Sequence, residues 1–94
     1  MRIAWDEAKS RANRLKHGVS FETARLVFDD PLHVSVPDRH EHGEERWKTI
    51  GQVGAVVILV VAHTYGEENG EEIIRIISAR KATKSERERY RNES

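Results

Sequence analysis

The chain has 94 residues, of which 37% are hydrophobic and 34% are charged, and its formal net charge is zero. This length suits a single domain, residues 1–94, with a core just large enough to fold alone. The absence of cysteine excludes disulfides and thiolate metal sites. The longest apolar run, Ala55–Ala62, is far shorter than the roughly 20 residues that span a bilayer. The N-terminus lacks the apolar segment of a signal peptide. We therefore expect a soluble, cytoplasmic protein with no membrane partner.

The basic residues are concentrated near the two ends of the chain. Residues 9–16 carry Lys9, Arg11, Arg14 and Lys16, and the stretch from Ile73 to Arg91 is rich in arginine and lysine. If the two ends meet in space, they form a phosphate-binding surface on a neutral protein. The alternative is that these charges are the ordinary solvated faces of helices.

The N-terminal third predicts a short strand and then a helix. Residues 2–4 suit a strand, Asp6 is an N-cap residue, and Gly18 suits a C-terminal stop. The helix is expected over residues 6–16. Its apolar stripe consists of Trp5, Ala8, Ala12 and Leu15.

A second helix is predicted to begin after Ser20, which is a good N-cap residue. The sequence Asp29-Asp30-Pro31 ends it, because proline disfavours helix in the residue before it. The residues expected to face the core from this helix are Phe21, Ala24, Val27 and Phe28.

The next part of the chain predicts strands. They are expected over residues 32–36, 45–51, 55–65 and 73–79, joined by a polar turn at 38–43, a tight connection at 52–54 and a hairpin turn at Asn69-Gly70. Thr83 and Glu86 then form a capping box that opens a C-terminal helix. The order β-α-α-β-β-β-β-α predicts an α+β fold. In it, an antiparallel sheet carries two N-terminal helices and a C-terminal helix on one face.

Five histidines raise the question of a metal site. His40 and His42 are the tightest pair, but they lie in a predicted turn without a well-placed third ligand, so we predict neither a metal nor a cofactor. His63 ends the most apolar strand, where it suits either a tuned catalytic imidazole or a core position. His17 follows Lys16 at a helix end, where the helix dipole favours a cation, so it suits either a catalytic role or this structural one.

Arg75 and Arg80 are five residues apart, so on one regular strand they face opposite sides of the sheet unless a bulge intervenes. Arg75 interrupts an apolar run and needs a partner, a phosphate or solvent. Tyr90 lies within the last helix, where its ring either packs on the sheet or serves a site near Arg80.

Several segments together resemble the BrnT toxin family, the ribonuclease toxins of bacterial type II toxin–antitoxin modules. They are WDEAKSRANRLKHGVSFETARLVFDDP, GEERWKTIG, VVAHT and RIISARKATKSERERY, and they cover the chain from Trp5 to Tyr90. The resemblance implies a RelE-like fold and metal-independent RNA cleavage that inhibits translation and growth. It also implies a BrnA-type antitoxin, which neutralises the toxin and contacts operator DNA in its place.

RNA cleavage needs deprotonation of the 2′-OH, stabilisation of the charged phosphorane and protonation of the leaving oxygen. Arginine suits the second task, so Arg80 is the first candidate and Arg75 the second. For proton transfer the candidates are His63, His17 and Tyr90, and the resemblance favours Arg80 with Tyr90, whose pKa an arginine cluster would lower. The candidate RNA-binding residues are Lys16, Arg46, Lys81, Lys84 and Arg87.

One segment departs from the family pattern. Residues 67–72 carry four glutamates where the family hairpin is more basic, so we expect weaker phosphate binding there. Two other functions stay open: a nucleic-acid-binding module without catalysis, and a degenerate toxin that only binds its antitoxin.

Overall fold

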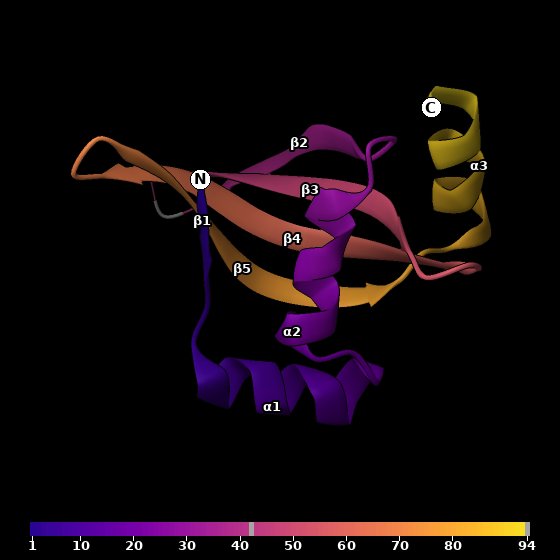
Figure 1. The fold of residues 1–94 in the computed structure, drawn as a ribbon, viewed down its shortest axis with the longest axis horizontal. Helices are drawn as coiled ribbons and strands as arrows, with labels where there is room; N and C mark the ends of the chain where they lie inside the picture. Colours follow the sequence, from indigo (N-terminus) through magenta and orange to yellow (C-terminus); the bar gives the residue numbers. More distant parts are fainter. Residues whose placement is uncertain (42, 94) are drawn as a thin grey trace.

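The computed structural model describes residues 1–41 and 43–93 (Figure 1). Its elements are β1 (Arg2–Ala4), α1 (Glu7–His17), α2 (Phe21–Ala24), the 3₁₀ helix η1 (Arg25–Asp29), β2 (Val34–Glu41), β3 (Glu44–Val53), β4 (Val57–Glu68), β5 (Glu71–Lys81) and α3 (Lys84–Glu93). The predicted order is confirmed, with η1 as an extension of the second helix. None of the described helices is long and apolar enough to cross a membrane.

The predicted polar turn at residues 38–43 is wrong for its first four residues. Asp38 to Glu41 continue strand β2, and His42 lies outside the described residues. The polar character of this segment misled the prediction, because β2 is the edge strand of the sheet and the side chains of Asp38, Arg39 and His40 are exposed there.

The strands form a five-stranded sheet in the order β1-β5-β4-β3-β2. Strands β2 to β5 are joined by hairpins and are antiparallel, as predicted, and the β4–β5 turn places Asn69 and Gly70 at positive φ. The expectation of a purely antiparallel sheet is wrong at its edge, because β1 pairs parallel to β5. No hairpin links these two strands, so a short loop does not determine their relative direction.

The two faces of the sheet are covered differently. Phe21, Ala24 and Val27 pack with Leu59 and Val61 in one core cluster. Ile58 and Val60 point to the other face, which we call the open face, and pack there with Ile50 and Tyr90 of α3. The expectation that all helices lie on one face is therefore wrong. Strand β4 carries apolar residues on both of its faces, so both faces of the sheet must be covered by other elements.

Helix α1 begins and ends where predicted, but its apolar stripe is not the buried side. The Asp6 side chain accepts a hydrogen bond from Lys9 N, and Gly18 adopts a left-handed conformation with φ of 75°. Leu15 is 90% exposed, whereas Ser10 and Asn13 are buried. Asn13 is buried because its side-chain amide pairs with the backbone of β5. Its Nδ2 donates to Ala79 O and its Oδ1 accepts from Ala79 N, so these two backbone groups have hydrogen-bond partners.

Candidate active site on the open face of the sheet

Basic side chains gather on the open face. Residues that pair directly on neighbouring strands point to the same face. Arg80 pairs with Val60, and Lys48 pairs with Ala62. Arg39 pairs with Arg46, which pairs with Thr64, and Thr64 also pairs with Arg75. The open face therefore carries a basic group that comes from three strands: Arg39, Arg46, Lys48, Arg75 and Arg80.

A bulge in β5 places Arg75 and Arg80 on one face. Ala62 pairs with Ser78 but His63 pairs with Ile76, so Ile77 is an extra residue on β5. The extra residue reverses the alternation between the two arginines. For a regular strand we predicted that the two arginines face opposite sides, with a bulge as the exception. The strand has that bulge, so the prediction of opposite faces is wrong. Arg75 is exposed.

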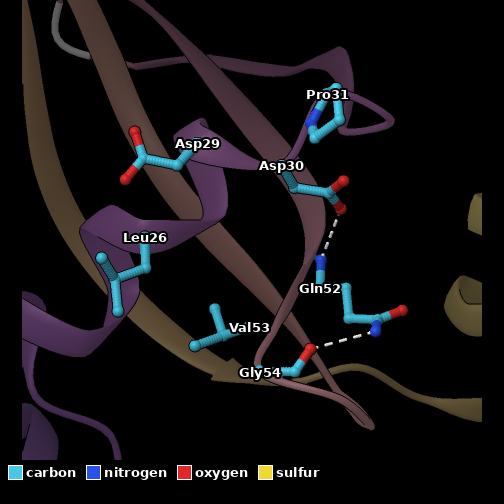
Figure 2. Close-up of a pocket in the computed structure, with 7 residues that line it drawn as sticks. All are labelled: Leu26, Asp29, Asp30, Pro31, Gln52, Val53 and Gly54. Atoms are coloured by element: carbon cyan, nitrogen blue, oxygen red, sulfur yellow. Dashed lines mark hydrogen bonds between the residues drawn. The ribbon is translucent and has the colours of Figure 1, made fainter.

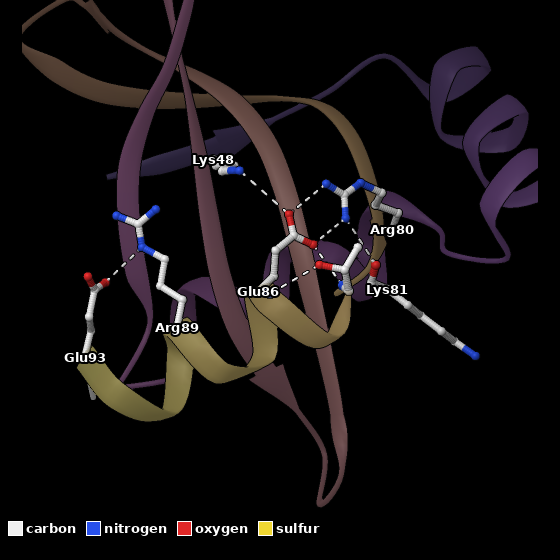
Figure 3. Close-up of polar contacts among 7 residues, drawn as sticks. Lys48, Arg80, Lys81, Glu86, Arg89 and Glu93 are labelled. Carbon is white, nitrogen blue, oxygen red and sulfur yellow. Dashed lines mark hydrogen bonds and ion pairs between the residues drawn. The ribbon is translucent and has the colours of Figure 1, made fainter.

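Arg80 is held by a carboxylate from α3 (Figure 3). Its Nη1 and Nη2 donate to Glu86 Oε1 and Oε2 at 2.7 and 2.9 Å, and Lys48 Nζ lies 3.7 Å from Glu86 Oε2. Glu86 Oε1 also accepts a hydrogen bond from Thr83 N, and Glu86 N donates to Thr83 Oγ1, so the predicted capping box is confirmed. The hydrogen bonds from Arg80 lower the pKa of Glu86 to about 2, and the same contact raises the pKa of Arg80.

Arg80 also borders a cavity of about 150 Å³ on the open face. The cavity is lined by Asp38, Arg39, Lys48, Val60, Ala62, Ser78 and Arg80. Its three cationic side chains come from β2, β3 and β5, so the sheet itself fixes their spacing. A phosphate group placed here meets positive charge from several sides.

Tyr90 has a different partner from the one expected. The hydroxyl of Tyr90, a residue only 6% exposed, donates to Asp30 Oδ2 at 2.6 Å. Burial and the Asp30 carboxylate raise the pKa of Tyr90 to about 12. The expectation that an arginine cluster would lower this pKa is wrong, because the neighbour of the hydroxyl is an anion.

Asp30 borders a second cavity, of about 300 Å³ (Figure 2), and its hydrogen bonds reach β3 and α3. Its carboxylate accepts hydrogen bonds from Gln52 N at 2.8 Å and from Leu32 N at 2.9 Å, besides that from Tyr90. Burial raises its pKa, but these hydrogen bonds outweigh burial and the pKa is lowered. Asp30 therefore stabilises the turn that follows η1, where the sequence predicts the end of the second helix.

His63 lies on the helix-covered face and is fully buried. Its Nε2 is 2.7 Å from Thr49 Oγ1, and its ring stands edge-on to Phe28 and Tyr65. Burial lowers the pKa of His63 to about 4, and the backbone of Thr64 only partly offsets this. His63 is thus a neutral core residue at pH 7, separated by the sheet from the basic group of the open face.

The remaining candidates are spread over other surfaces. Lys16 and His17 line a groove between α1 and the bulged part of β5. Lys81 pairs with Leu59 and so points to the opposite face from Arg80. Lys84 is exposed at the start of α3, and Arg87 donates to Ala82 O at 2.9 Å. Of the candidate residues in the strands, Arg46 and Arg75 lie on the open face with Arg80, beside Arg39 and Lys48.

Sequence reasoning missed Arg39, Lys48, Asp38 and Glu86 as site residues. The signal for Lys48 was present, because alternation along residues 45–51 puts Lys48 on the same face as Arg46 and Ile50. Asp38 gave no such signal, because it belonged to a predicted turn. Glu86 was recognised as a capping residue, and its bond to Arg80 depends on how α3 packs.

The acidic hairpin lies at the far end of the sheet from Arg80. Glu72 precedes Arg80 by eight residues on β5, which corresponds to about 26 Å of strand. Arg2 contacts Glu68 and Glu71 at 3.4 and 3.6 Å. At this separation the hairpin charges are screened from the cavity in physiological salt. Among the described residues, no group of three or more histidine, aspartate or glutamate side chains is arranged to hold a metal ion.

Comparison with known proteins points to one family. The family described as "Ribonuclease toxin, BrnT, of type II toxin-antitoxin system" matches residues 5–86. Among solved structures, the fold is similar to the 1.1 Å crystal structure of the Brucella abortus ribonuclease toxin BrnT, with a TM-score of 0.67 and 30% sequence identity. That match covers 89% of this chain and 99% of the Brucella chain. No curated protein sequence matches the chain.

Proposed function

This chain belongs to the BrnT family of ribonuclease toxins of type II toxin–antitoxin systems, and from that premise we propose that it cleaves RNA on the open face of its sheet, at the cavity beside Arg80. The observation that carries the proposal is the meeting of Arg80, Lys48 and Arg39 around one cavity, from three strands.

The proposed chemistry is stabilisation of a phosphorane by fixed cations. In-line attack of the 2′-oxygen on phosphorus increases the negative charge on the two non-bridging oxygens. Arg80 provides a planar fork for these oxygens, and Lys48 provides a compact positive charge. Glu86 occupies the Nη1–Nη2 edge of the Arg80 guanidinium, which leaves the Nε–Nη2 edge as the donor pair for a phosphate. Because side-chain cations supply the charge, the proposed reaction is metal-independent.

RNA outside the cavity is proposed to extend over Arg46 and Arg75, which lie on the same face. Lys16 and Lys81 lie away from the open face, and Lys84 and Arg87 lie on α3 without bordering the cavity, so we give these four residues no part in the cleavage step. The same holds for His17, for His63 in the core and for Tyr90, whose hydroxyl is bonded to Asp30.

The cellular role follows from family membership. We propose that RNA cleavage inhibits translation and growth in the cytoplasm and that a BrnA-type antitoxin neutralises it. Operator DNA would be contacted through the antitoxin. The RelE-like grouping of the fold is part of the same proposal.

Replacement of Arg80 by Ala tests the proposed site. We expect RNA cleavage by the purified protein to fall by roughly 10²-fold or more, as on loss of a group that stabilises transition-state charge. Growth arrest on expression without antitoxin should be lost as well. Lys81→Ala is the matched control, because it removes a neighbouring positive charge from the opposite face. A folded Arg80→Ala protein with unimpaired cleavage would contradict the proposal, and RNA binding without cleavage by the unmodified chain would indicate a binding module instead.

A further inference from the structure

The cavity beside Arg80 needs a proton acceptor as well as cations. Arginine is always protonated in proteins, and a lysine ammonium is a donor without an acceptor. Glu86 is a poor acceptor, because hydrogen bonds from Arg80 and Thr83 occupy both its oxygens. His63 is buried on the other face, and the Tyr90 hydroxyl already donates to Asp30. The base must therefore come from another residue of the cavity.

Asp38 is the carboxylate that lines this cavity. The register of β2 on β3 shifts between Pro37 and Arg39, which makes Asp38 the extra residue of a bulge in the edge strand. Val36 pairs with Lys48 and Arg39 pairs with Arg46, so both face the open side. Alternation from Val36 puts Asp38 on that side as well, and the bulge lets Asp38 and Arg39 both border the cavity.

The carboxylate of Asp38 also has acceptor capacity to spare. It lies close enough to raise the pKa of Arg80 by its charge, but it forms no hydrogen bond or ion pair with any residue that the structure describes. Its exposed position on the edge strand leaves it accessible to a substrate hydroxyl. It therefore differs from Glu86, whose oxygens are committed to Arg80 and the start of α3.

We propose that Asp38 is the general base that accepts the 2′-OH proton of the RNA, an inference that rests on the ribonuclease function proposed above. As the O–H bond breaks, the 2′-oxygen forms a bond to phosphorus and the P–O5′ bond breaks. The 5′-oxygen takes a proton from the Lys48 ammonium, and the products are a 2′,3′-cyclic phosphate and a 5′-hydroxyl. Asp38 then releases its proton to water and Lys48 regains one, so the protein is unchanged.

The test is Asp38→Asn, which preserves side-chain size and removes the basic oxygen. Cleavage of an end-labelled RNA should fall by about 10²- to 10⁴-fold, the usual contribution of a general base. Affinity for a non-cleavable 2′-deoxy-substituted strand, measured by fluorescence anisotropy, should stay the same or increase, because a negative charge leaves a basic site. Asp38→Glu should retain part of the activity. Glu72→Gln is the control, because it removes the same charge at the far end of β5.

The outcomes separate this inference from the function on which it rests. Cleavage by Asp38→Asn at the wild-type rate, beside an inactive Arg80→Ala, would overturn the role of Asp38 and leave the ribonuclease site standing. A parallel loss of binding and cleavage in Asp38→Asn would also overturn it, since that pattern belongs to a residue that only positions Arg80. A wild-type chain that cleaves no RNA would overturn both proposals. Thermal unfolding of each variant checks that it is folded.

Discussion

Replacement of Glu86 by Gln isolates one charge at the junction between α3 and the open face. Glutamine keeps an oxygen for the Thr83 N–H, so the capping box survives. What is lost is the negative charge that Arg80 contacts at 2.7 and 2.9 Å and Lys48 at 3.7 Å. We expect the variant to be less stable and its α3 to dock less firmly on the sheet.

The size of the effect follows from the pKa of Glu86. Its fall from 4.5 to about 2 corresponds to a free energy of about 3 kcal/mol, at 1.36 kcal/mol per pH unit. The Glu86 side chain is 14% exposed, but that of Arg80 is 42% exposed, so solvent screens their interaction. We therefore expect Glu86→Gln to lower the free energy of unfolding by about 1–2 kcal/mol at pH 7.

The same interaction predicts how this difference depends on pH. The folded pKa is depressed, so the stabilisation is present above the unfolded value of 4.5 and is lost as the pH falls toward about 2. The gap between the wild type and Glu86→Gln should therefore shrink across that range.

Urea unfolding followed by tryptophan fluorescence, at pH 7 and again at pH 3, measures this gap. Glu88→Gln is the matched control on the same helix, because Glu88 is exposed. A gap that is equal at both pH values, or no larger than that of Glu88→Gln, would refute the reasoning.

Three further predictions concern residues that hold the fold together. Tyr90→Phe removes the hydrogen bond to Asp30 and should lower the free energy of unfolding, measured with urea, by about 1–3 kcal/mol. RNA cleavage should be unchanged, and a large loss of cleavage in a folded protein would restore Tyr90 as a catalytic residue. Asn13→Ala leaves Ala79 N and O without their side-chain partner and should lower the free energy of unfolding by about 2–4 kcal/mol. Ala12→Ser, on the exposed side of α1, should change it little. Because the folded pKa of His63 is lowered from 6.5 to about 4, wild-type stability should fall as pH drops through that window. His63→Gln should remove this dependence and His40→Gln should not.

The sequence predicts the elements of this fold well wherever local chemistry determines them. The N-caps at Asp6 and Ser20, the stop at Gly18 and the Thr83–Glu86 capping box are all present. Each depends on a side chain and a backbone group within a few residues of one another. The order of the elements follows from these signals together with the period of the apolar residues.

The buried side of α1 could not be predicted in the same way. Its apolar residues indicated one face, but Asn13 is buried because a strand 66 residues away needs hydrogen-bond partners. Such a need is not visible in the local pattern. The pairing of Tyr90 with Asp30, 60 residues apart, is a second case.

The position of Arg75 relative to Arg80 depends on a single extra residue. The run Ile73–Ile77 is apolar at almost every position, so a shift of one residue exchanges one isoleucine for another in the core. Hydrophobic patterning therefore does not reveal the bulge at Ile77, although the bulge decides which face carries Arg75. The candidate site was predicted only as far as Arg80, Arg46 and Arg75, and the cavity required the register of all the central strands.

The register also explains how a chain of zero net charge can present a basic surface. Alternation along each strand sends successive side chains to opposite faces, and hairpin pairing then aligns those of neighbouring strands. The basic residues of β2, β3 and β5 meet on the open face, whereas four glutamates are placed at the β4–β5 turn, about 26 Å of strand from Arg80. With a screening length of about 8 Å in physiological salt, an RNA phosphate in the cavity responds to the local cations. We therefore expect the balance between Glu86 and the cations that it contacts, rather than the net charge of the chain, to govern phosphate binding at the proposed site.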